Sequence, residues 1–366
     1  MEFLNTKKGL VVAGLVIGAL TAVLAATGNP GNMAICAACF IRDIAGSLYL
    51  HTAPPVQYFR PEIVGFICGS FLIAVATKEY RSTAGSSPMI RFVLGFIIMI
   101  GSLVFLGCPL RMVIRMSAGD LNAYVAFVGI ICGAITGAIF LKKGYSLGRE
   151  YDTNKAAGAT LPIAMAVLLV IGLATGLYAV SEKGPGSMHA PVFLALAIAL
   201  VIGAVAQKTR ICFVGGIRNT FLMQDYSLRL PIVGIFVAML VYNIATGHFN
   251  LSFDGQPIAH SQHIWNFLGM YTVGFAGVLA GGCPLRQMIL TGQGSCDSAV
   301  TFLGMLVGAA FAHNFGLAGA AAAAATADTP AVAGGPAPAG QVALIACIVI
   351  LFVIAATNLR AKKKAA

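Results

Sequence analysis

The sequence is poor in charged residues. Aspartate, glutamate, lysine and arginine make up 10% of its 366 residues, whereas hydrophobic residues make up 58%. A soluble domain carries about 25% charged residues, so a soluble globular class is excluded and lipid must be the solvent for most of the surface. The formal net charge of +11 is therefore interpreted as membrane topology, and nucleic acid is not an expected partner.

Three other absences narrow the class of function. The sequence contains no Gly-x4-Gly-Lys-Ser/Thr loop, so this chain is not expected to hydrolyse ATP. The nine cysteines lie mostly in apolar stretches and lack the spacing of a disulfide framework. His313 stands alone within an apolar run, while the other histidines fall at span ends or in outer loops. We therefore expect no metal, no cofactor and no enzyme.

The sequence does contain ten apolar runs, each long enough to cross a membrane with about 18–20 residues. They lie near Leu10–Thr27, Glu62–Glu79, Met89–Leu106, Asn122–Leu141, Thr160–Val180, Pro191–Lys208, Pro231–His248, Ile264–Gly281, Ala299–Leu317 and Gln341–Thr357. The basic start and apolar core of Met1–Gly28 resemble a signal peptide. Because the same segment has a counterpart in the second half, we interpret it as the first span.

Positive charge is distributed unevenly between the connecting segments. If the amino terminus is cytoplasmic, 16 lysines and arginines fall inside and only Arg60, Arg115 and Lys183 fall outside, apart from four motif arginines described below. The inner set consists of Lys7, Lys8, Lys78, Arg81, Arg91, Lys142, Lys143, Arg149, Lys155, Lys208, Arg210, Arg229, Arg360 and Lys362–Lys364. The stretches Phe249–His263 and Ala318–Gly340 contain no lysine or arginine. The positive-inside rule therefore predicts that both termini are cytoplasmic.

Two motifs occur twice in the same register. Ile-Cys-Ala-Ala-Cys-Phe-Ile-Arg at Ile35–Arg42 aligns with Ile-Cys-Phe-Val-Gly-Gly-Ile-Arg at Ile211–Arg218, and Gly-Cys-Pro-Leu-Arg occurs at Gly107–Arg111 and at Gly282–Arg286. The cysteines of the two motifs are 72 residues apart in one half and 71 in the other. Each copy holds five spans, an odd number, so the second copy must cross the membrane upside down. We predict an all-α integral membrane protein with two inverted repeats, residues 1–158 and 159–366, in one integrated domain with a site at its centre.

The Gly-Cys-Pro-Leu-Arg motif predicts a broken helix. Glycine ends the preceding helix, and proline cannot continue it but suits the first turn of a new one. Cys108 and Cys283 should therefore lie at the positive end of a half-helix, where free N–H groups attract anions. Arg111 and Arg286 add positive charge. Symmetry should bring Cys36, Cys108, Cys212 and Cys283 toward a common axis.

The Cys-x5-Arg motif lies in segments too short to cross the membrane in both directions. Met33–Tyr49 and Ile211–Asp225 are therefore predicted to be re-entrant, with Arg42 and Arg218 near the cysteines. Thiols are weak donors and polarizable neighbours, so thiols backed by arginine suit a soft anion such as a sulfur or selenium species. A phosphate would need arginine, lysine and backbone amides only.

Other interpretations of these residues stay open. A membrane cysteine is usually a small packing residue, which is our interpretation of Cys68, Cys132 and Cys347. Cys39 and Cys296 have no partner in the other repeat. The motif arginines could instead be interfacial anchors. The carboxylates beside the motifs could balance charge, carry protons or serve structure alone; they are Asp43, Asp120 and Asp297.

At Cys36–Arg42, Cys108–Arg111, Cys212–Arg218 and Cys283–Arg286 the chain resembles the YeeE/YedE family of bacterial inner-membrane transporters. Gly-Cys-Pro-Leu-Arg used twice and the run Arg210–Arg218 make it similar to the YedE-like branch linked with selenium metabolism. The resemblance implies inverted repeats whose half-helices meet at the bilayer centre. It also implies that Cys108 and Cys283, and with them Cys36 and Cys212, pass a thiosulfate-like or selenium compound, with a small cytoplasmic sulfur-carrier protein as a partner.

Two functions of other classes compete with transport. A membrane thiol–disulfide electron carrier is favoured by the Cys36-x-x-Cys39 spacing, although Gly215 replaces the second cysteine in the other repeat. Such a carrier needs two cysteines within disulfide reach. A membrane anchor or assembly subunit without transport is the third possibility, and it gives the repeated motifs no role.

Overall fold

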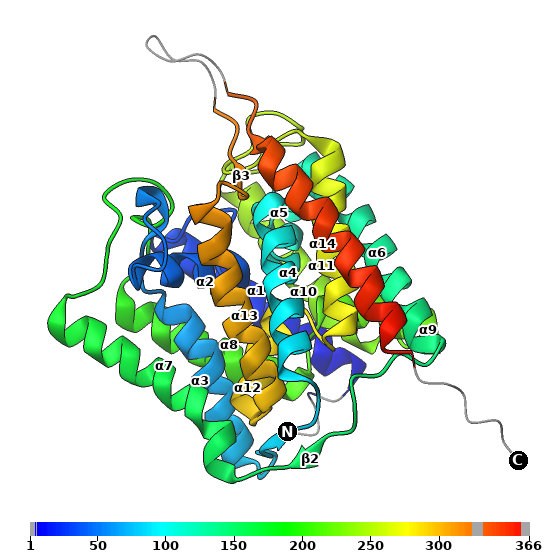
Figure 1. Ribbon diagram of the computed structural model, residues 1–366. Coiled ribbons are helices and arrows are strands. Elements are labelled where there is room, and N and C mark those ends of the chain that lie inside the picture. Colours follow the sequence, from blue (N-terminus) through cyan, green and yellow to red (C-terminus); the bar gives the residue numbers. More distant parts are fainter. Residues whose placement is uncertain (1–3, 5, 324–331, 360–366) are drawn as a thin grey trace, which may run out of the picture.

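The chain is almost entirely helical. The computed structural model describes residue 4, residues 6–323 and residues 332–359. These residues form α1 (Lys7–Ala26), α2 (Ala37–Ser47), α3 (Pro61–Ala76), α4 (Pro88–Val104), α5 (Pro109–Ser117), α6 (Leu121–Lys142), α7 (Lys155–Thr175), α8 (Val192–Thr209), α9 (Phe213–Met223), α10 (Leu230–Ala245), α11 (His263–Leu279), α12 (Pro284–Gln293), α13 (Cys296–Asn314) and α14 (Pro338–Thr357). Two 3₁₀ turns, η2 (Pro54–Val56) and η3 (Ser227–Arg229), precede α3 and α10. Figure 1 shows the helices gathered into one bundle.

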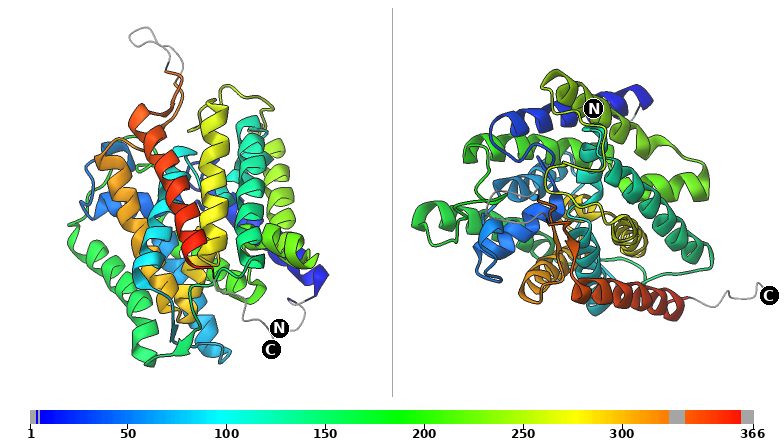
Figure 2. Two further views of the ribbon diagram at one scale, coloured as in Figure 1. Left: turned by 45° about the vertical axis from the view of Figure 1, so that its right-hand side comes forward. Right: turned by 90° about the horizontal axis from the view of Figure 1, so that it is seen from above.

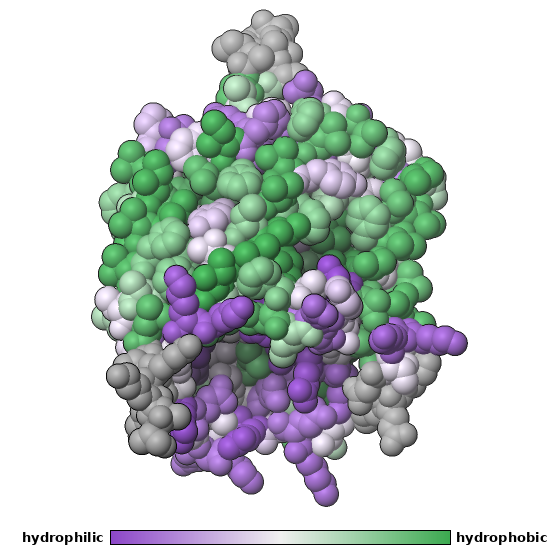
Figure 3. Space-filling model, turned by 90° about the vertical axis from the view of Figure 1, so that its right-hand side faces the viewer, coloured by the Kyte–Doolittle hydropathy of each residue, from purple (hydrophilic) through white to green (hydrophobic). Residues whose placement is uncertain are grey.

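Ten helical stretches in the described part of the chain are long and apolar enough to cross a membrane. They confirm the ten predicted spans and the all-α membrane class. Three of them join a long helix to a short one, at Pro88–Ser117, Val192–Met223 and His263–Gln293. Figure 3 shows an apolar surface over most of one flank, with hydrophilic residues gathered at the lower face. Arg360, Lys362–Lys364 and residues 324–331 of the predicted outer stretch lie outside the described residues.

The helices form two sets with the same order, α1–α7 and α8–α14. The four most extensive helix contacts between the sets form two inverted pairs: α6 packs on α11 as α13 packs on α4, and α3 packs on α8 as α10 packs on α1. α4 and α11 contact each other near the centre. The two sets are thus interlocked rather than side by side. Residue 159, where the sequence analysis divided the repeats, lies inside α7.

Polar residues close one face of the bundle. We call it the N-side face, because α1 begins there and α14 ends there, at the bottom of Figure 2, left. The segment after α6 runs along this face, where Tyr145 pairs with Leu359 and strand β2 (Tyr151–Asp152) pairs antiparallel with β1 (Thr83–Ala84). The opposite face, here the far face, carries β3 (Gly319–Ala320) paired with β4 (Gly335–Pro336).

The segment between α10 and α11 covers part of the far face. Asn250 N donates to Ala118 O at 2.9 Å, and Leu121 N donates to Ser252 O at 3.1 Å. His260 is buried, and its Nε2 lies 2.8 Å from Val104 O. The sequence places this histidine at a span end or in an outer loop, where exposure is expected. The structure buries it instead because the segment folds back over the end of α4.

Candidate functional site

Cys36 and Cys108 form a thiol pair in the first repeat. Cys108 is the N-cap of α5, as the Gly-Cys-Pro-Leu-Arg motif predicts. Cys36 is the N-cap of α2 in the segment predicted to be re-entrant. Their sulfur atoms lie 3.7 Å apart. The Cys36 sulfur accepts from Cys39 N at 3.3 Å. The backbone groups of Ala38 and Arg111 are electrostatic neighbours of the Cys108 sulfur. Both thiols are thus held at the positive ends of two half-helices.

Cys212 and Cys283 repeat this arrangement in the second repeat. Cys212 is the N-cap of α9 and accepts from Gly215 N at 3.2 Å, while Cys283 is the N-cap of α12. The two thiols are close enough to interact electrostatically, and the backbone of Phe213 is another electrostatic neighbour of the Cys283 sulfur. The same chemistry is therefore built twice.

The two thiol pairs lie at different depths of the bundle. α4 has 17 residues before the break at Cys108, which is a rise of about 25 Å from the N-side face. α11 approaches its break at Cys283 from the far face with the same length. Figure 1 accordingly shows α5 in the upper half and α12 in the lower half. Within the described residues no hydrogen bond joins one pair to the other, so the four cysteines form two pairs rather than one cluster.

Arg111 holds the first break together. Its side chain is fully buried and donates to the carbonyls of Asn32 and Ile258 at 3.2 and 3.0 Å and to that of Leu106. It also donates to the Asn32 side-chain oxygen at 3.1 Å and lies 3.5 Å from the Cys39 sulfur. These acceptors saturate the guanidinium. Arg111 therefore supports the non-helical backbone around the thiols.

Arg286 occupies the same motif position but has a different environment. It is half-buried, and its Nη1 is a buried atom without a hydrogen-bond partner in the described part of the chain. Its electrostatic neighbours are Cys212, Cys283 and Arg210. Gly282 makes room for it, because a Cβ there would lie 2.8 Å from Arg286 Cγ. Arg286 is thus an unsatisfied cationic donor beside a thiol pair.

Arg42 and Arg218 show a second difference between the repeats. The Arg42 guanidinium donates twice to Asp43 Oδ1, at 3.0 and 2.8 Å, and Arg218 donates in the same way to Asn219 Oδ1, at 3.0 and 2.9 Å. Asp43 also pairs with the buried Arg60 at 2.8 Å. The carboxylate neutralises charge in the first repeat, whereas the amide of Asn219 leaves the charge of Arg218 in place.

Two adjoining cavities open on the N-side face below the second thiol pair. Their volumes are about 320 and 240 Å³, and both are lined by Arg91, Glu150 and Gly281. Arg81 and Ser298 line the larger one, and Arg218 and Asp297 the smaller one. Gly281 lies two residues before Cys283. We call the two together the N-side cavity; it is a cation-rich space that ends at the second helix break.

The structure also places residues that the sequence analysis did not assign to the site. Arg115 and Arg60 were expected in outer segments, but both are fully buried. Arg115 pairs with Asp120 at 2.6 Å and stacks on Phe105. The acidic residues beside the motifs thus balance buried arginines. The signal that could have identified them is the occurrence of arginine and aspartate close together between apolar stretches, where an unpaired charge is costly.

The fold and the paired thiol sites define a multi-pass α-helical membrane protein with anion-attracting helix ends. Residues 208–366 match the family model described as Sulphur transport. This match confirms the family resemblance predicted from the motifs, and it includes Cys212 and Cys283. The chain is also 25% identical over 104 residues to the thiosulfate transporter TsuA of Spirochaeta thermophila. The aligned segment spans 28% of this chain and 31% of that relative, about a third of its length.

Proposed function

We propose that the protein transports an anionic sulfur compound across the membrane, passing it between the two thiol pairs. The observation that carries this proposal is the pair of thiols at half-helix N-termini beside the unsatisfied Arg286. The helix ends and the guanidinium attract the anion. The thiols offer weak S–H donors, which permit release as well as binding. Transport, rather than catalysis, is the role that such a site serves.

The substrate class follows from the softness of the site. Thiosulfate and selenium oxyanions expose a large polarizable atom to a thiol and oxygen atoms to arginine and backbone N–H groups. The N-side cavity supplies the arginines, and each thiol pair supplies two sulfur atoms. We include the selenium compounds because Gly-Cys-Pro-Leu-Arg occurs in both repeats. The motif residues of the pathway are Cys36, Cys108, Cys212, Cys283, Arg42, Arg111, Arg218 and Arg286.

We further propose that the N-side face is cytoplasmic and the membrane is the bacterial inner membrane. Lys7 begins α1, Lys78 and Lys143 follow α3 and α6, and Lys208 lies in the last turn of α8. Their position at this face agrees with the positive-inside rule. A small sulfur-carrier protein on this side would receive the substrate at the mouth of the N-side cavity. Both termini are then cytoplasmic.

Uptake into proteoliposomes tests the proposal. Radiolabelled thiosulfate and selenite are offered to wild-type protein and to Cys108→Ala and Cys283→Ala. We expect uptake of at least one anion, and a loss of about tenfold or more in either variant. Cys68→Ala and Cys347→Ala are the matched controls, because both cysteines lie outside the thiol pairs. Equal behaviour of all four variants, or no uptake by folded wild-type protein, would reject the central thiol pathway.

A thiol–disulfide electron carrier is the second candidate. The 3.7 Å between the sulfurs of Cys36 and Cys108 brings two thiols within reach of a small movement that would form a bond of about 2.05 Å. Thiol trapping before and after addition of a quinone oxidant decides between the candidates. Reversible loss of both free thiols, together with activity that depends on Cys39, would favour the carrier. Thiols that remain free during uptake would exclude it.

A further inference from the structure

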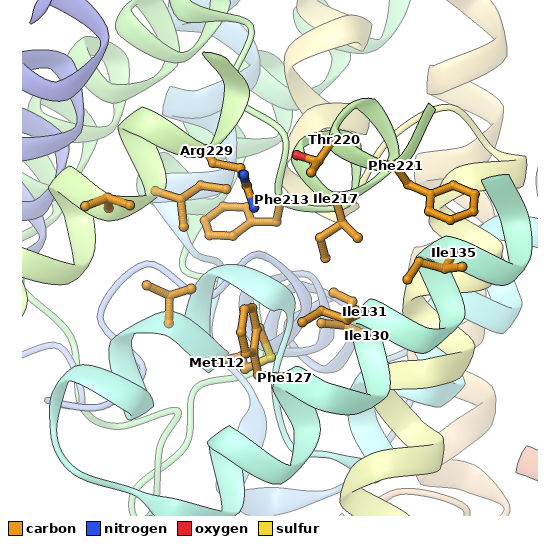
Figure 4. A pocket seen from close by; sticks show the side chains of 13 residues that line it. Met112, Phe127, Ile130, Ile131, Ile135, Phe213, Ile217, Thr220, Phe221 and Arg229 are labelled. Carbon is orange, nitrogen blue, oxygen red and sulfur yellow. The ribbon is translucent and has the colours of Figure 1, made fainter. Parts of the chain in front are cut away.

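An open groove lies between α5 and α6 of the first helix set and α9 and α10 of the second. The groove has a volume of about 460 Å³. Figure 4 shows Phe221 and Ile217 on one side and Ile131 and Ile135 on the other. Its lining is apolar except for Thr220 and Arg229. The volume falls in the range of about 300–1,000 Å³ that is typical of ligand sites.

Two residues that line the groove are exposed, whereas their counterparts in the inverted repeat are buried. By the register of the Cys-x5-Arg motif Phe221 corresponds to Ala45. Counted from the N-caps of α10 and α3, Val233 corresponds to Val64. Phe221 and Val233 are 46% and 53% exposed, whereas Ala45 and Val64 are 0% and 2% exposed. The helix order makes α14 the counterpart of α7. α7 packs against α3, α12 and α13, but α14 packs mainly against α4 and α11, away from α5 and α10.

Arg229 is the cation at the rim of this groove. It is the N-cap of α10, just as Arg60 is the N-cap of α3. Arg60 donates to Asp43 at 2.8 Å and to the carbonyls of Met188 and Pro185 at 3.0 and 2.7 Å. Those carbonyls belong to the segment that follows α7.

Arg229 lacks all of these partners. Asn219 stands where the first repeat has Asp43, and α14 is the last helix of the described chain. Within the described residues the Arg229 guanidinium forms no hydrogen bond or ion pair, and it lies over the ring of Tyr226 at 4.5 Å. The nearby Asp225 instead accepts from Ser227 N at 2.9 Å. The half-buried Arg229 therefore has no anionic partner among the residues that the structure describes.

We propose that the groove binds one anionic phospholipid of the N-side leaflet. Its phosphate pairs with Arg229, and an acyl chain lies along α6 and α9. Arginine binds phosphate through two parallel N–H donors, and the apolar lining suits a hydrocarbon chain. The lipid thus supplies the anion and the apolar surface that Asp43 and neighbouring helices supply in the first repeat. This inference goes beyond the proposed transport, because the groove is separate from the N-side cavity.

Native mass spectrometry of the full-length protein tests this site. Purified protein is incubated with equal amounts of phosphatidylglycerol and phosphatidylcholine. We expect one phosphatidylglycerol to be retained with about tenfold preference over phosphatidylcholine. Arg229→Gln should remove the preference, Arg229→Lys should keep part of it, and Val233→Trp should block both lipids. Lys143→Gln is the matched control, since Lys143 is another basic residue at the N-side end of a helix but does not line the groove.

Four results of the lipid-retention experiment would overturn the proposal. They are equal retention of the two lipids by wild-type protein, unchanged retention in Arg229→Gln, an equal loss in Lys143→Gln, and full displacement of the lipid by inorganic phosphate alone. A dimer that dissociates in Val233→Trp would assign the groove to a second copy of the chain and also reject the lipid. Size-exclusion profiles check that each variant is folded, and Ile131→Trp provides a second blocking variant from α6.

Discussion

At the scale of single residues, identical motif positions have different physical roles. Arg111 and Arg286 both end Gly-Cys-Pro-Leu-Arg, yet Arg111 is saturated by backbone oxygens and Arg286 retains an unsatisfied buried nitrogen. A saturated guanidinium stabilises the fold, whereas an unsatisfied one can bind an anion. The difference arises from residues far away in sequence, because Asn32 and Ile258 reach only the first break.

We therefore predict opposite effects for the two arginines. Arg111→Gln leaves several buried carbonyls without a donor, each at a cost of about 1–3 kcal/mol. It should lower the thermal midpoint in detergent strongly. Arg286→Gln should leave that midpoint nearly unchanged but raise the KM for anion uptake about tenfold. Destabilisation by Arg286→Gln with unaltered uptake kinetics would contradict the assignment.

Asp43 lies beside Arg42, and Asn219 lies beside Arg218 at the matching position. This difference leads to another prediction. Asp43→Asn leaves Arg42 and Arg60 buried without a counter-charge, which costs about 3–5 kcal/mol, and should reduce the yield of folded protein. Asn219→Asp is the reciprocal change. It places a carboxylate against Arg218, so uptake of an anion should fall while the protein stays folded. Thermal midpoints and uptake rates separate the two outcomes, and equal stability loss in both variants would refute the proposed asymmetry.

At the scale of secondary-structure elements, the helix breaks and the re-entrant segments position the four motif cysteines. α2 and α9 have 11 residues each, which is about 16 Å of helix and too short to cross a bilayer. α5 and α12 are shorter still. Each of the four helices begins at a motif cysteine, so every thiol lies at a positive helix end. The segment between α10 and α11 supports the first break from the far face through Ile258 and His260.

Burial of that segment predicts a pH dependence of stability. Burial lowers the pKa of His260 from 6.5 to about 4, since the charged ring would lose its solvation. Its Nε2 is placed to donate to Val104 O at 2.8 Å, and Gln262 N lies 3.3 Å from Nδ1. Because the pKa in the folded protein lies below that in the unfolded chain, the unfolded chain binds more protons in this window. The contribution is fully present above pH 6.5 and is lost as the pH falls toward 4.

Thermal melting of wild-type protein and His260→Gln between pH 7.5 and pH 4.5 measures this effect. The wild-type midpoint should fall more steeply on acidification than the midpoint of the variant, which has no ring to protonate. Parallel curves would show that His260 does not contribute to the acid sensitivity.

At the scale of the whole molecule, the two repeats depend on each other. The long helices of one repeat pack against those of the other, as Figure 2 shows from above. Small residues permit these close contacts. Gly133 of α6 faces the backbone of Tyr271 in α11, and a Cβ at Gly133 would clash with Tyr271 O. The separate repeats therefore lack the partner surfaces that they need to fold.

Gly133→Ala should for this reason disturb the whole bundle. The helices α6 and α11 would have to separate, so we expect less monodisperse protein and a lower thermal midpoint. Gly31→Ala is the matched control, because nothing lies within 4 Å of a Cβ at that position. Size-exclusion chromatography of both variants gives the comparison. Normal behaviour of Gly133→Ala would show that the interface tolerates a larger spacing.

The sequence by itself determined the ten spans, the broken helices and the duplicated motifs. These features are local: in lipid each backbone segment must satisfy its own hydrogen bonds, so apolar length and glycine–proline pairs suffice to identify them. The placement of cysteines at helix N-caps follows from the same local chemistry. The match of residues 208–366 to a sulphur transport family agrees with those motifs.

Only the tertiary structure decided how the motif residues are grouped and which charges are neutralised. It separates the cysteines into two pairs and saturates Arg111, whereas Arg286 keeps one donor without a partner among the described residues. It also places α14 away from the groove beside Arg229. These differences depend on contacts between segments more than 70 residues apart, such as that of Arg111 with Asn32. Two nearly identical motifs cannot encode such contacts, because the partners that distinguish them lie outside the motifs.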